Sequence, residues 1–257
     1  MIHQLTHIDP KAKIGNNVTV SPFSTIYGDV EIGDDTWIGP NVTIMDGARI
    51  GKNVKIFPGA VISAIPQDLK YKDEPTTAEI GDNTVIRECV TMNKGTIDKN
   101  KTSIGKNCLI MAYVHLAHDC IVGNNVILAN NVGLSGHITI DDWAILEGFA
   151  VAQQFVHIGA HSFIGGATLI RKNVPPYVKA AREPISYIGV NTVGLSRRGF
   201  DKETIRLIED IYRTLFVRGH NMSKALEVVE AEIPESDVKS EILSFIRNSK
   251  DGVIRGI

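Results

Sequence analysis

The sequence predicts a parallel β-helix followed by a small helical domain, and two periodicities indicate this. From Ile104 to Pro175 the chain divides into twelve consecutive six-residue blocks with no residue left over, and every block opens with an apolar residue. After Pro176 the apolar residues recur at three- and four-residue spacing, which is typical of helices. A period of six is typical of a parallel β-helix, in which each repeat buries its apolar face only by stacking on its neighbours.

Two positions of each block are expected to face a common interior. The openers are Ile104, Ile110, Leu116, Val122, Leu128, Leu134, Ile140, Leu146, Ala152, Ile158, Ile164 and Ile170. The fifth position is small or β-branched, as at Cys108 and Val126. The second is often glycine and the fourth often asparagine, as at Gly105 and Asn107, and we expect both to take positive φ at bends. With three blocks per coil, residues eighteen apart lie on one wall, about 4.8 Å from each other.

The same frame already runs from Ile8 to Ile62 and returns at Ile80, Ile86 and Met92. It breaks at the polar run that follows Pro66 and again at a charged run from Asp98. We therefore expect a β-helix over 1–176 with loop excursions near 66–78 and 98–102. A connecting segment and a helical domain should occupy 177–257. Its helices are expected from an Asp201 cap to Gly219, over about 223–233, and from about Ser236 onward.

Composition and charge argue against several classes of partner. With 257 residues and 43% apolar residues the chain can bury a sizeable core. A net charge of −2 without a long basic run gives no support to nucleic acid or a membrane surface as the main partner. The start from Met1 to Pro10 lacks the regions of a signal peptide, and no apolar run approaches the roughly 18 residues of a membrane span, so a cytoplasmic protein without membrane insertion is expected. The three cysteines fit neither a disulfide framework nor a zinc pattern, and Cys108 and Cys120 are expected in the core.

Chemically distinctive residues recur at eighteen-residue spacing. His118 should lie beside Gly136, and Asp119 beside His137, with Gln154 one coil beyond Gly136. From the period alone this column is either a solvated surface or a catalytic site. Zinc held by His115, His118 and His137 is an alternative. We expect no metal and no cofactor, because Asp119 and Gly136 already give His118 a role in a metal-free reaction.

Several motifs resemble one acyltransferase family along nearly the whole chain. They are the hexads, the loop 67–71, the runs 115–120 and 127–131, Gly136-His137, Gln154-Phe155, Gly159-Ala160-His161, Val174-Pro175-Pro176-Tyr177-Val178 and Arg197-Arg198-Gly199-Phe200. The family is that of the acyl-carrier-protein–UDP-N-acetylglucosamine O-acyltransferases. The resemblance implies a left-handed coil and a homotrimer with sites between subunits. It also implies transfer of an (R)-3-hydroxyacyl group from acyl carrier protein to the 3-hydroxyl of UDP-N-acetylglucosamine, the first step of lipid A synthesis. The sister N-acyltransferases are the alternative; they usually carry an extra N-terminal domain, whereas the hexads here begin at Ile8.

The resemblance, together with the eighteen-residue spacing, assigns the reacting groups. A neutral imidazole with a pKa of about 6.5 is a suitable base for a sugar hydroxyl, and His118 fits that role. Asp119 can orient the ring, and the Gly136 N–H can donate to the oxyanion that develops on the thioester.

The remaining assignments come from the resemblance alone. Asp68 and Lys70 match residues that bind the sugar and phosphate of the nucleotide, with Gln67 as a neighbour, while Arg197 and Arg198 match a pair near the diphosphate, where a guanidinium fork suits phosphate oxygens. The positions that match the sugar and acyl site are His115, His137 and Gln154. Asn191 matches a nucleotide contact.

Two positions depart from the family pattern and two bear on acyl length. Gln153 stands where familiar members have a histidine, and Val193 where they have a glutamate. Gly166 matches the position that closes the acyl groove. Because glycine leaves that groove open, we expect a preference for chains of about fourteen carbons or more over ten, with Phe163 able to narrow the path.

Overall fold

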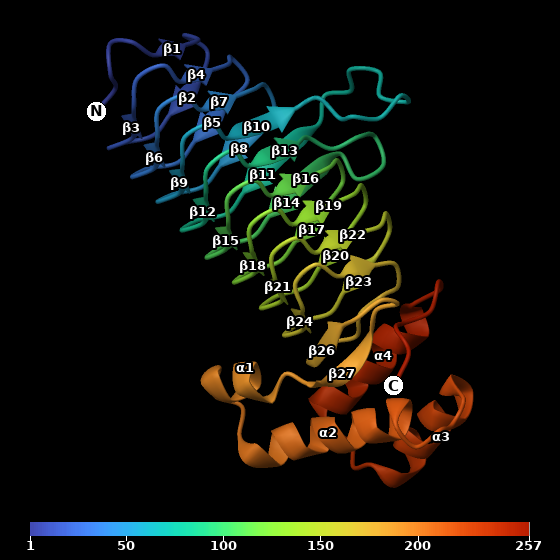
Figure 1. Ribbon diagram of the computed structural model, residues 1–257. Coiled ribbons are helices and arrows are strands. Elements are labelled where there is room, and N and C mark those ends of the chain that lie inside the picture. Colours follow the sequence, from blue (N-terminus) through green and yellow to red (C-terminus); the bar gives the residue numbers. More distant parts are fainter. Residues whose placement is uncertain (257) are drawn as a thin grey trace.

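The computed structural model describes residues 1–256 as three parallel sheets wound into a prism, with helices at one end (Figure 1). Each six-residue block forms one short strand, which gives the twenty-five strands from β1 to β25. Each strand is two to four residues long and ends at the apolar opener of its block or just after it. Strands of neighbouring uninterrupted coils pair eighteen residues apart, as His115 does with Gly133. The β-helix predicted from the period is therefore confirmed, while its left-handed sense stays a prediction from the family.

Three walls make up the prism. Wall one contains β1 (His7–Ile8), β4 (Thr25–Ile26), β7 (Thr43–Ile44), β10 (Val61–Ala64), β13 (Thr91–Asn93), β16 (His115–Leu116), β19 (Gly133–Leu134), β22 (Val151–Ala152) and β25 (Leu169–Ile170). Wall two contains β2 (Lys13–Ile14), β5 (Glu31–Ile32), β8 (Ala48–Ile50), β11 (Thr77–Ile80), β14 (Lys101–Ile104), β17 (Ile121–Val122), β20 (Thr139–Ile140) and β23 (His157–Ile158). Wall three contains β3 (Thr19–Val20), β6 (Trp37–Ile38), β9 (Lys55–Ile56), β12 (Val85–Ile86), β15 (Leu109–Ile110), β18 (Ile127–Leu128), β21 (Ile145–Leu146), β24 (Phe163–Ile164), β26 (Val178–Ala181) and β27 (Ser186–Val190).

The bends follow a rule that the sequence predicted only in part. The fourth residue of every six-residue block from Asn107 to Ala167 has positive φ, including Asp119 and His137. Glycine at the second position does not need positive φ, so that expectation was wrong. At Gly105 the reason for glycine is close packing, because an added Cβ would lie 2.5 Å from the carbonyl oxygen of Gly123 in the next coil. The openers and fifth positions form the core, Cys108 and Cys120 among them.

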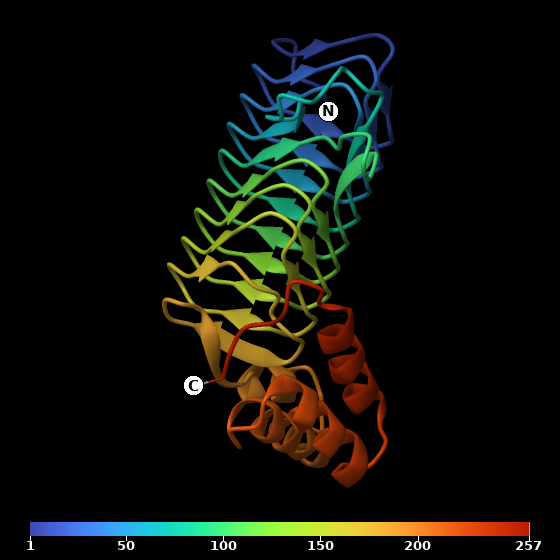
Figure 2. The same cartoon turned by 90° about the vertical axis from the view of Figure 1, so that its right-hand side faces the viewer.

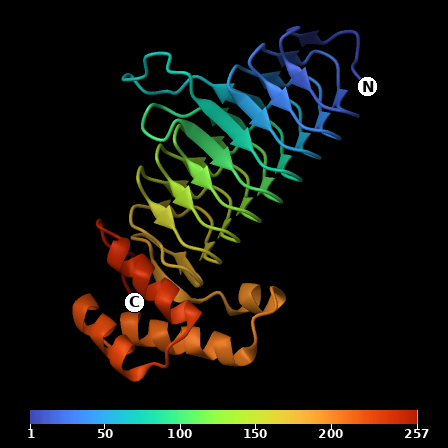
Figure 3. The ribbon, with the colours of Figure 1, turned by 180° about the vertical axis from the view of Figure 1, so that it is seen from behind.

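We call the corner from wall one to wall two the first edge, and both loop excursions leave the prism there. Figure 3 shows them on the same side, as the cyan and green loops. The first occupies 65–76 rather than 66–78, and the second 94–100 rather than 98–102. The predicted bounds were wrong because Thr77 and Ala78 pair with Lys101 and Thr102, which extends β11 and β14 toward the loops. Two neighbouring coils thus contribute loops to one edge.

The sheet continues past Pro176, and the helices follow it. Strand β26 pairs in parallel with β24, and β27 returns antiparallel to β26. The helices are α1 (Thr192–Arg197), α2 (Lys202–Phe216), α3 (Met222–Glu232) and α4 (Asp237–Asn248). Asp201 and Ser236 cap α2 and α4 as expected, whereas α1 lies in the segment predicted as a connection. Figure 2 shows α4 beside the last coils, where Phe245 packs on His157 with ring centroids 4.6 Å apart. Among residues 1–256, no helix has both the length and the apolar character needed to cross a bilayer.

Candidate functional site

His118, Asp119 and Gly136 come together on the first edge, as the eighteen-residue spacing predicts. His118 Nδ1 lies 2.8 Å from Asp119 Oδ2, and both side chains are buried. The Cε1 and Nε2 atoms of the ring lie against Gly136, where an added Cβ would be 2.8 Å from His118 Nε2. In the neutral ring that donates Nδ1–H to Asp119, Nε2 is an acceptor beside the Gly136 backbone. Within residues 1–256 the Gly136 N–H donates to no protein acceptor.

Asp119 is fully buried and its carboxylate accepts hydrogen bonds from the second excursion. Thr96 donates its backbone N–H to Oδ1 at 3.0 Å and its hydroxyl to Oδ2 at 2.6 Å, and the Lys99 N–H donates to Oδ1 at 3.2 Å. Burial alone would raise the pKa of Asp119, but the hydrogen bonds from Thr96, His118 and Lys99 lower it below its usual value. The carboxylate beside His118 is therefore ionised at neutral pH.

His137 lies next to this pair and is held from two sides. Its Nδ1 lies 2.9 Å from Asp98 Oδ2, its Nε2 lies 3.9 Å from Asp119 Oδ2, and its ring stacks on Phe155 with centroids 4.6 Å apart. The predicted closeness of Asp119 and His137 is thus confirmed. Asp119, His137 and Phe155 are fourth-position residues of successive coils and all have positive φ, so the same bend directs each side chain outward from the edge.

A pocket of about 290 Å³ opens beside His137 between the two excursions. Asp68, Lys70, Tyr71 and Glu74 of the first excursion, Thr96, Ile97 and Asp98 of the second, and His137 and Phe155 line it. The structure therefore brings Asp68 and Lys70 to the His118 region. Gln67 and Lys70 are exposed, and Asp68 accepts the Lys70 backbone N–H at 2.9 Å. Within residues 1–256 the Lys70 ammonium group makes no hydrogen bond or salt bridge.

Three further predicted residues lie on or near this edge. His115 points outward from wall one, with Nδ1 2.8 Å from Thr91 Oγ1, and burial lowers its pKa. Gln153 and Gln154 are exposed on the first edge in the coil of Phe155.

The nucleotide residues of the C-terminal region lie on a different edge. Asn191 caps α1 by accepting the Gly194 N–H, and its amide donates to the His161 carbonyl oxygen at 2.9 Å. Arg198 follows α1 and lies over the Trp143 ring, 5.2 Å from its centroid. Trp143 and His161 are fourth-position residues at the corner from wall two to wall three, which we call the second edge. Burial, with Arg198 nearby, lowers the pKa of His161 to about 4. Arg197 is exposed at the end of α1, as is Val193.

The acyl-length residues lie on or beside the third edge, from wall three to wall one. Gly166 is exposed there, and its N–H donates to Glu147 Oε2 at 3.2 Å. Phe163 points outward from β24 and is half-buried. In one copy of the chain, His118, Arg198 and Gly166 therefore occupy three different edges and do not meet.

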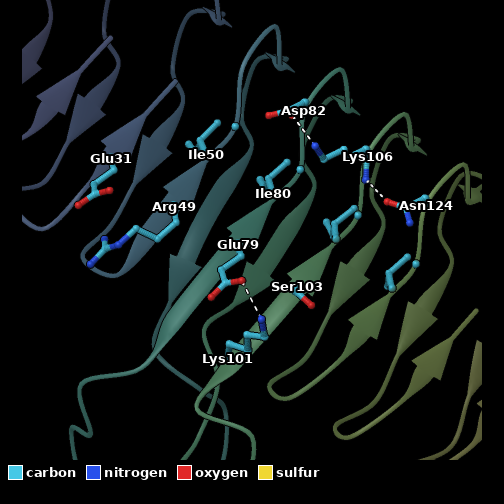
Figure 4. Close-up of a pocket in the computed structure, with 16 residues that line it drawn as sticks. Glu31, Arg49, Ile50, Glu79, Ile80, Asp82, Lys101, Ser103, Lys106 and Asn124 are labelled. Atoms are coloured by element: carbon cyan, nitrogen blue, oxygen red, sulfur yellow. Dashed lines mark hydrogen bonds and ion pairs between the residues drawn. The ribbon is translucent and has the colours of Figure 1, made fainter. Parts of the chain in front are cut away.

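A larger hollow lies away from these groups. It has a volume of about 650 Å³ and lies on the outer face of wall two (Figure 4). Its charged residues form ion pairs, as Lys101 does with Glu79 at 3.0 Å and Lys106 with Asp82 at 2.9 Å, while Glu31 and Arg49 pair with residues outside the lining. None of the residues assigned to the reaction lines it.

One cluster could hold a metal by its donor types. Ligand atoms of His118, Asp119 and His137 lie within 4.8 Å of one another. However, both Asp119 oxygens already accept protein donors, and His137 Nδ1 pairs with Asp98. His115, the third member of the predicted zinc alternative, is not in this cluster.

Sequence reasoning missed Thr96, Asp98, Lys99 and Phe155 as neighbours of the site. The excursions break the eighteen-residue spacing, so it could not place the first three. Phe155 could have been found, since it follows His137 by eighteen residues.

Comparisons with known proteins show which proteins this chain resembles. A family model described as "Udp N-acetylglucosamine O-acyltransferase; Domain 2" matches residues 173–257, and one described as "Bacterial transferase hexapeptide (six repeats)" matches 29–64 and 101–136. An acyl-carrier-protein–UDP-N-acetylglucosamine O-acyltransferase of Aliivibrio fischeri (strain MJ11) is 41% identical over 262 residues, which cover 99% of this chain and 100% of the relative. A relative of the same name from Thiobacillus denitrificans (strain ATCC 25259 / T1) is 39% identical over 255 residues, 99% of each chain. The crystal structure of a UDP-N-acetylglucosamine acyltransferase from Bacteroides fragilis 9343 matches with a TM-score of 0.98 and 49% identity, over 99% of this chain and 100% of that one.

Proposed function

Because this chain belongs to the acyl-carrier-protein–UDP-N-acetylglucosamine O-acyltransferase family, we propose that the first edge around His118 is its active site. The enzyme transfers an acyl group from acyl carrier protein to UDP-N-acetylglucosamine in lipid A biosynthesis. In the proposal the donor is an (R)-3-hydroxyacyl thioester, the acceptor is the sugar 3-hydroxyl, and the reaction takes place in the cytoplasm.

The observation that carries this proposal is the orientation of His118. Its Nδ1–H donates to the buried Asp119, and its Nε2 lies beside the Gly136 backbone. Nε2 takes the hydroxyl proton while the sugar oxygen attacks the thioester carbon. The Gly136 N–H donates to the oxyanion of the tetrahedral intermediate. The C–S bond then breaks, and the imidazolium returns the proton to the departing thiolate, which leaves the carrier protein with a free thiol.

The pocket between the excursions supports the nucleotide assignments. Lys70 and Asp68 line it beside His137, so a UDP-sugar seated there would extend its sugar toward His118. We infer that Gln67, His115, Gln153 and Gln154 border the bound substrates. Gln67, Gln153 and Gln154 are exposed at this edge, and His115 points outward from the adjoining wall one.

A homotrimer is the proposed assembly, and two features of wall three support it. Its outward residues form an apolar, half-buried column of Val85, Leu109, Ile127, Ile145 and Phe163. The two edges of this wall carry Arg198 and Gly166. Packing wall three of one copy against the first edge of another would bring both residues toward His118, together with Arg197, Asn191 and Phe163. Light scattering at micromolar concentration should give three times the chain mass of 28.1 kDa, and a monomer would reject this assembly.

A metal-free reaction is also part of the proposal. The hydrogen bonds already made by Asp119 and His137 leave few free lone pairs for an ion. Dialysis against EDTA should leave turnover unchanged. Loss of turnover that zinc restores would revive the metal alternative.

The deciding experiment incubates the purified chain with UDP-N-acetylglucosamine and 3-hydroxyacyl carrier proteins of ten to sixteen carbons, a span of about six methylenes. Mass spectrometry should detect a UDP-acyl-sugar, and NMR should locate the ester on the 3-oxygen. A parallel incubation supplies an acceptor with a free amine. Transfer to that amine alone would reject the O-acyltransferase assignment.

A further inference from the structure

The second excursion, residues 94–100, bends over the corner that holds Asp119. The carboxylate of Asp119 has no exposed surface, and Thr96 is buried above it. The Thr96 and Lys99 N–H groups share Oδ1, while the Thr96 hydroxyl and His118 Nδ1 share Oδ2. A second threonine, Thr102 of β14, accepts the Asp119 backbone N–H at 2.8 Å. Side chain and backbone of Asp119 are therefore both fixed by this excursion and the strand that follows it.

The hydroxyl of Thr96 is linked to the His118 ring through one shared oxygen atom, Asp119 Oδ2. It is bound to the same carboxylate oxygen that accepts His118 Nδ1–H, and its 2.6 Å distance is the shortest of the four contacts to the Asp119 carboxylate. A buried carboxylate keeps one orientation only when its oxygens have partners in fixed positions. Without this hydroxyl, the backbone N–H groups of Thr96 and Lys99 would still hold Oδ1, but Oδ2 would keep His118 Nδ1–H as its one hydrogen-bond partner. Oδ2 and the ring bonded to it would then be held less rigidly in place.

We propose that Thr96 is a positioning residue, whose hydroxyl holds Asp119 Oδ2 where it accepts His118 Nδ1–H and so directs His118 Nε2 toward the reacting hydroxyl. This inference rests on the proposed function. It adds Thr96, from a loop outside the six-residue repeats, to the residues that act on His118.

The other charged groups around Asp119 do not duplicate this role. His137 Nε2 is 3.9 Å from Oδ2, outside hydrogen-bond range. The Asp98 carboxylate contacts His137, while the Asp98 backbone N–H donates to Thr96 Oγ1 at 3.4 Å. The Lys99 ammonium lies 3.4 Å from the His137 carbonyl oxygen, while its contact to Asp119 is through the backbone. Substituting Thr96 therefore removes a contact that no neighbouring side chain replaces.

The test compares two substitutions at Thr96. Thr96→Val keeps the shape of the side chain and removes the hydroxyl, and it should lower kcat about 10- to 100-fold with KM for UDP-N-acetylglucosamine within about threefold. Thr96→Ser keeps the hydroxyl and should restore kcat to within about threefold of wild type. Thr84→Val is the matched control, because Thr84 is also buried and donates its hydroxyl to a carbonyl oxygen, at Gly105, away from the site. It should lower the melting temperature without changing kcat.

A double substitution separates positioning from a general effect on folding. In an Asp119→Ala background, Thr96→Val should cost less than about threefold in kcat, since the carboxylate that it positions is gone. An equal loss in both backgrounds, or a wild-type kcat for Thr96→Val, would overturn the inference. His118→Ala distinguishes the two proposals. If His118→Ala keeps full turnover, the proposed function fails; if it is inactive while Thr96→Val is fully active, only the role of Thr96 fails.

Discussion

Gly136→Ala should reduce turnover strongly while leaving the fold intact. The added methyl group would lie 2.7 Å from His118 Cε1 and 2.8 Å from Nε2. Carbon atoms prefer a separation of about 3.5–4.0 Å, so the ring must move by about 1 Å. A displacement of that size at the reacting atom costs about 10²-fold in rate, or about 2.7 kcal/mol in the activation free energy. The backbone N–H is retained, so the loss would come from the ring position and not from the oxyanion donor. Steady-state kcat with saturating donor and acceptor measures it.

Gly133→Ala is the control for this substitution. Gly133 lies three residues earlier on β19, and its added Cβ would meet only Val151 at 3.8 Å, an ordinary contact. Gly133→Ala should therefore keep kcat within about twofold, because such a contact moves no neighbour. If Gly136→Ala kept more than half of the wild-type kcat, His118 would not act from the position that the structure gives it.

Four further outcomes are expected. His118→Ala should lower kcat about 10²–10⁴-fold at an unchanged melting temperature, because a general base is lost from outside the core; more than half of wild-type turnover would reject that role. Lys70→Ala should raise KM for UDP-N-acetylglucosamine more than it lowers kcat, and a fall in kcat alone would assign Lys70 to the chemistry. Gly166→Met should shift kcat/KM sharply toward shorter donors, by about 10–200-fold per methylene; an unchanged preference would mean that another residue sets the length. Burial lowers the pKa of His161 to about 4, so the folded state binds this proton less tightly than the unfolded chain. The stability linked to neutral His161 is present above about pH 6.5 and lost as pH falls toward 4, so His161→Phe should lose less melting temperature between pH 7 and pH 5 than wild type does. An equal loss in both would contradict this.

The architecture and the centre of the site could be predicted because both depend on a strict period. A one-residue slip would turn the openers outward, so the apolar pattern fixes the register of every coil. Register then fixes which residues are neighbours on an edge. For this reason the eighteen-residue spacing of the sequence was enough to place His118 against Gly136 and Asp119 near His137.

The contacts that the six-residue period could not predict are made by segments outside the repeats. The path of the excursion 94–100 depends on hydrogen bonds to Asp119 that no spacing rule contains, and so Thr96 was not foreseen. The stacking of Arg198 on Trp143 likewise joins a helix end to an edge across a non-repeating connection. Whether Arg198 and Gly166 reach His118 depends on a second copy, which the sequence of one chain does not describe.

The reactive groups occupy the corners where the backbone is most restricted. Elsewhere on the prism the positive-φ position is often asparagine, as at Asn107 and Asn125, because asparagine tolerates that conformation. On the first edge the same position carries Asp119, His137 and Phe155 in consecutive coils. A residue in a sparsely populated backbone conformation costs about 1–3 kcal/mol and persists only where its surroundings enforce it. Here the stacked coils above and below enforce the bend, so side chains that would destabilise an isolated turn are tolerated. The bend directs each of them away from the core, and neighbouring coils hold them close enough for one carboxylate to lie beside two imidazoles.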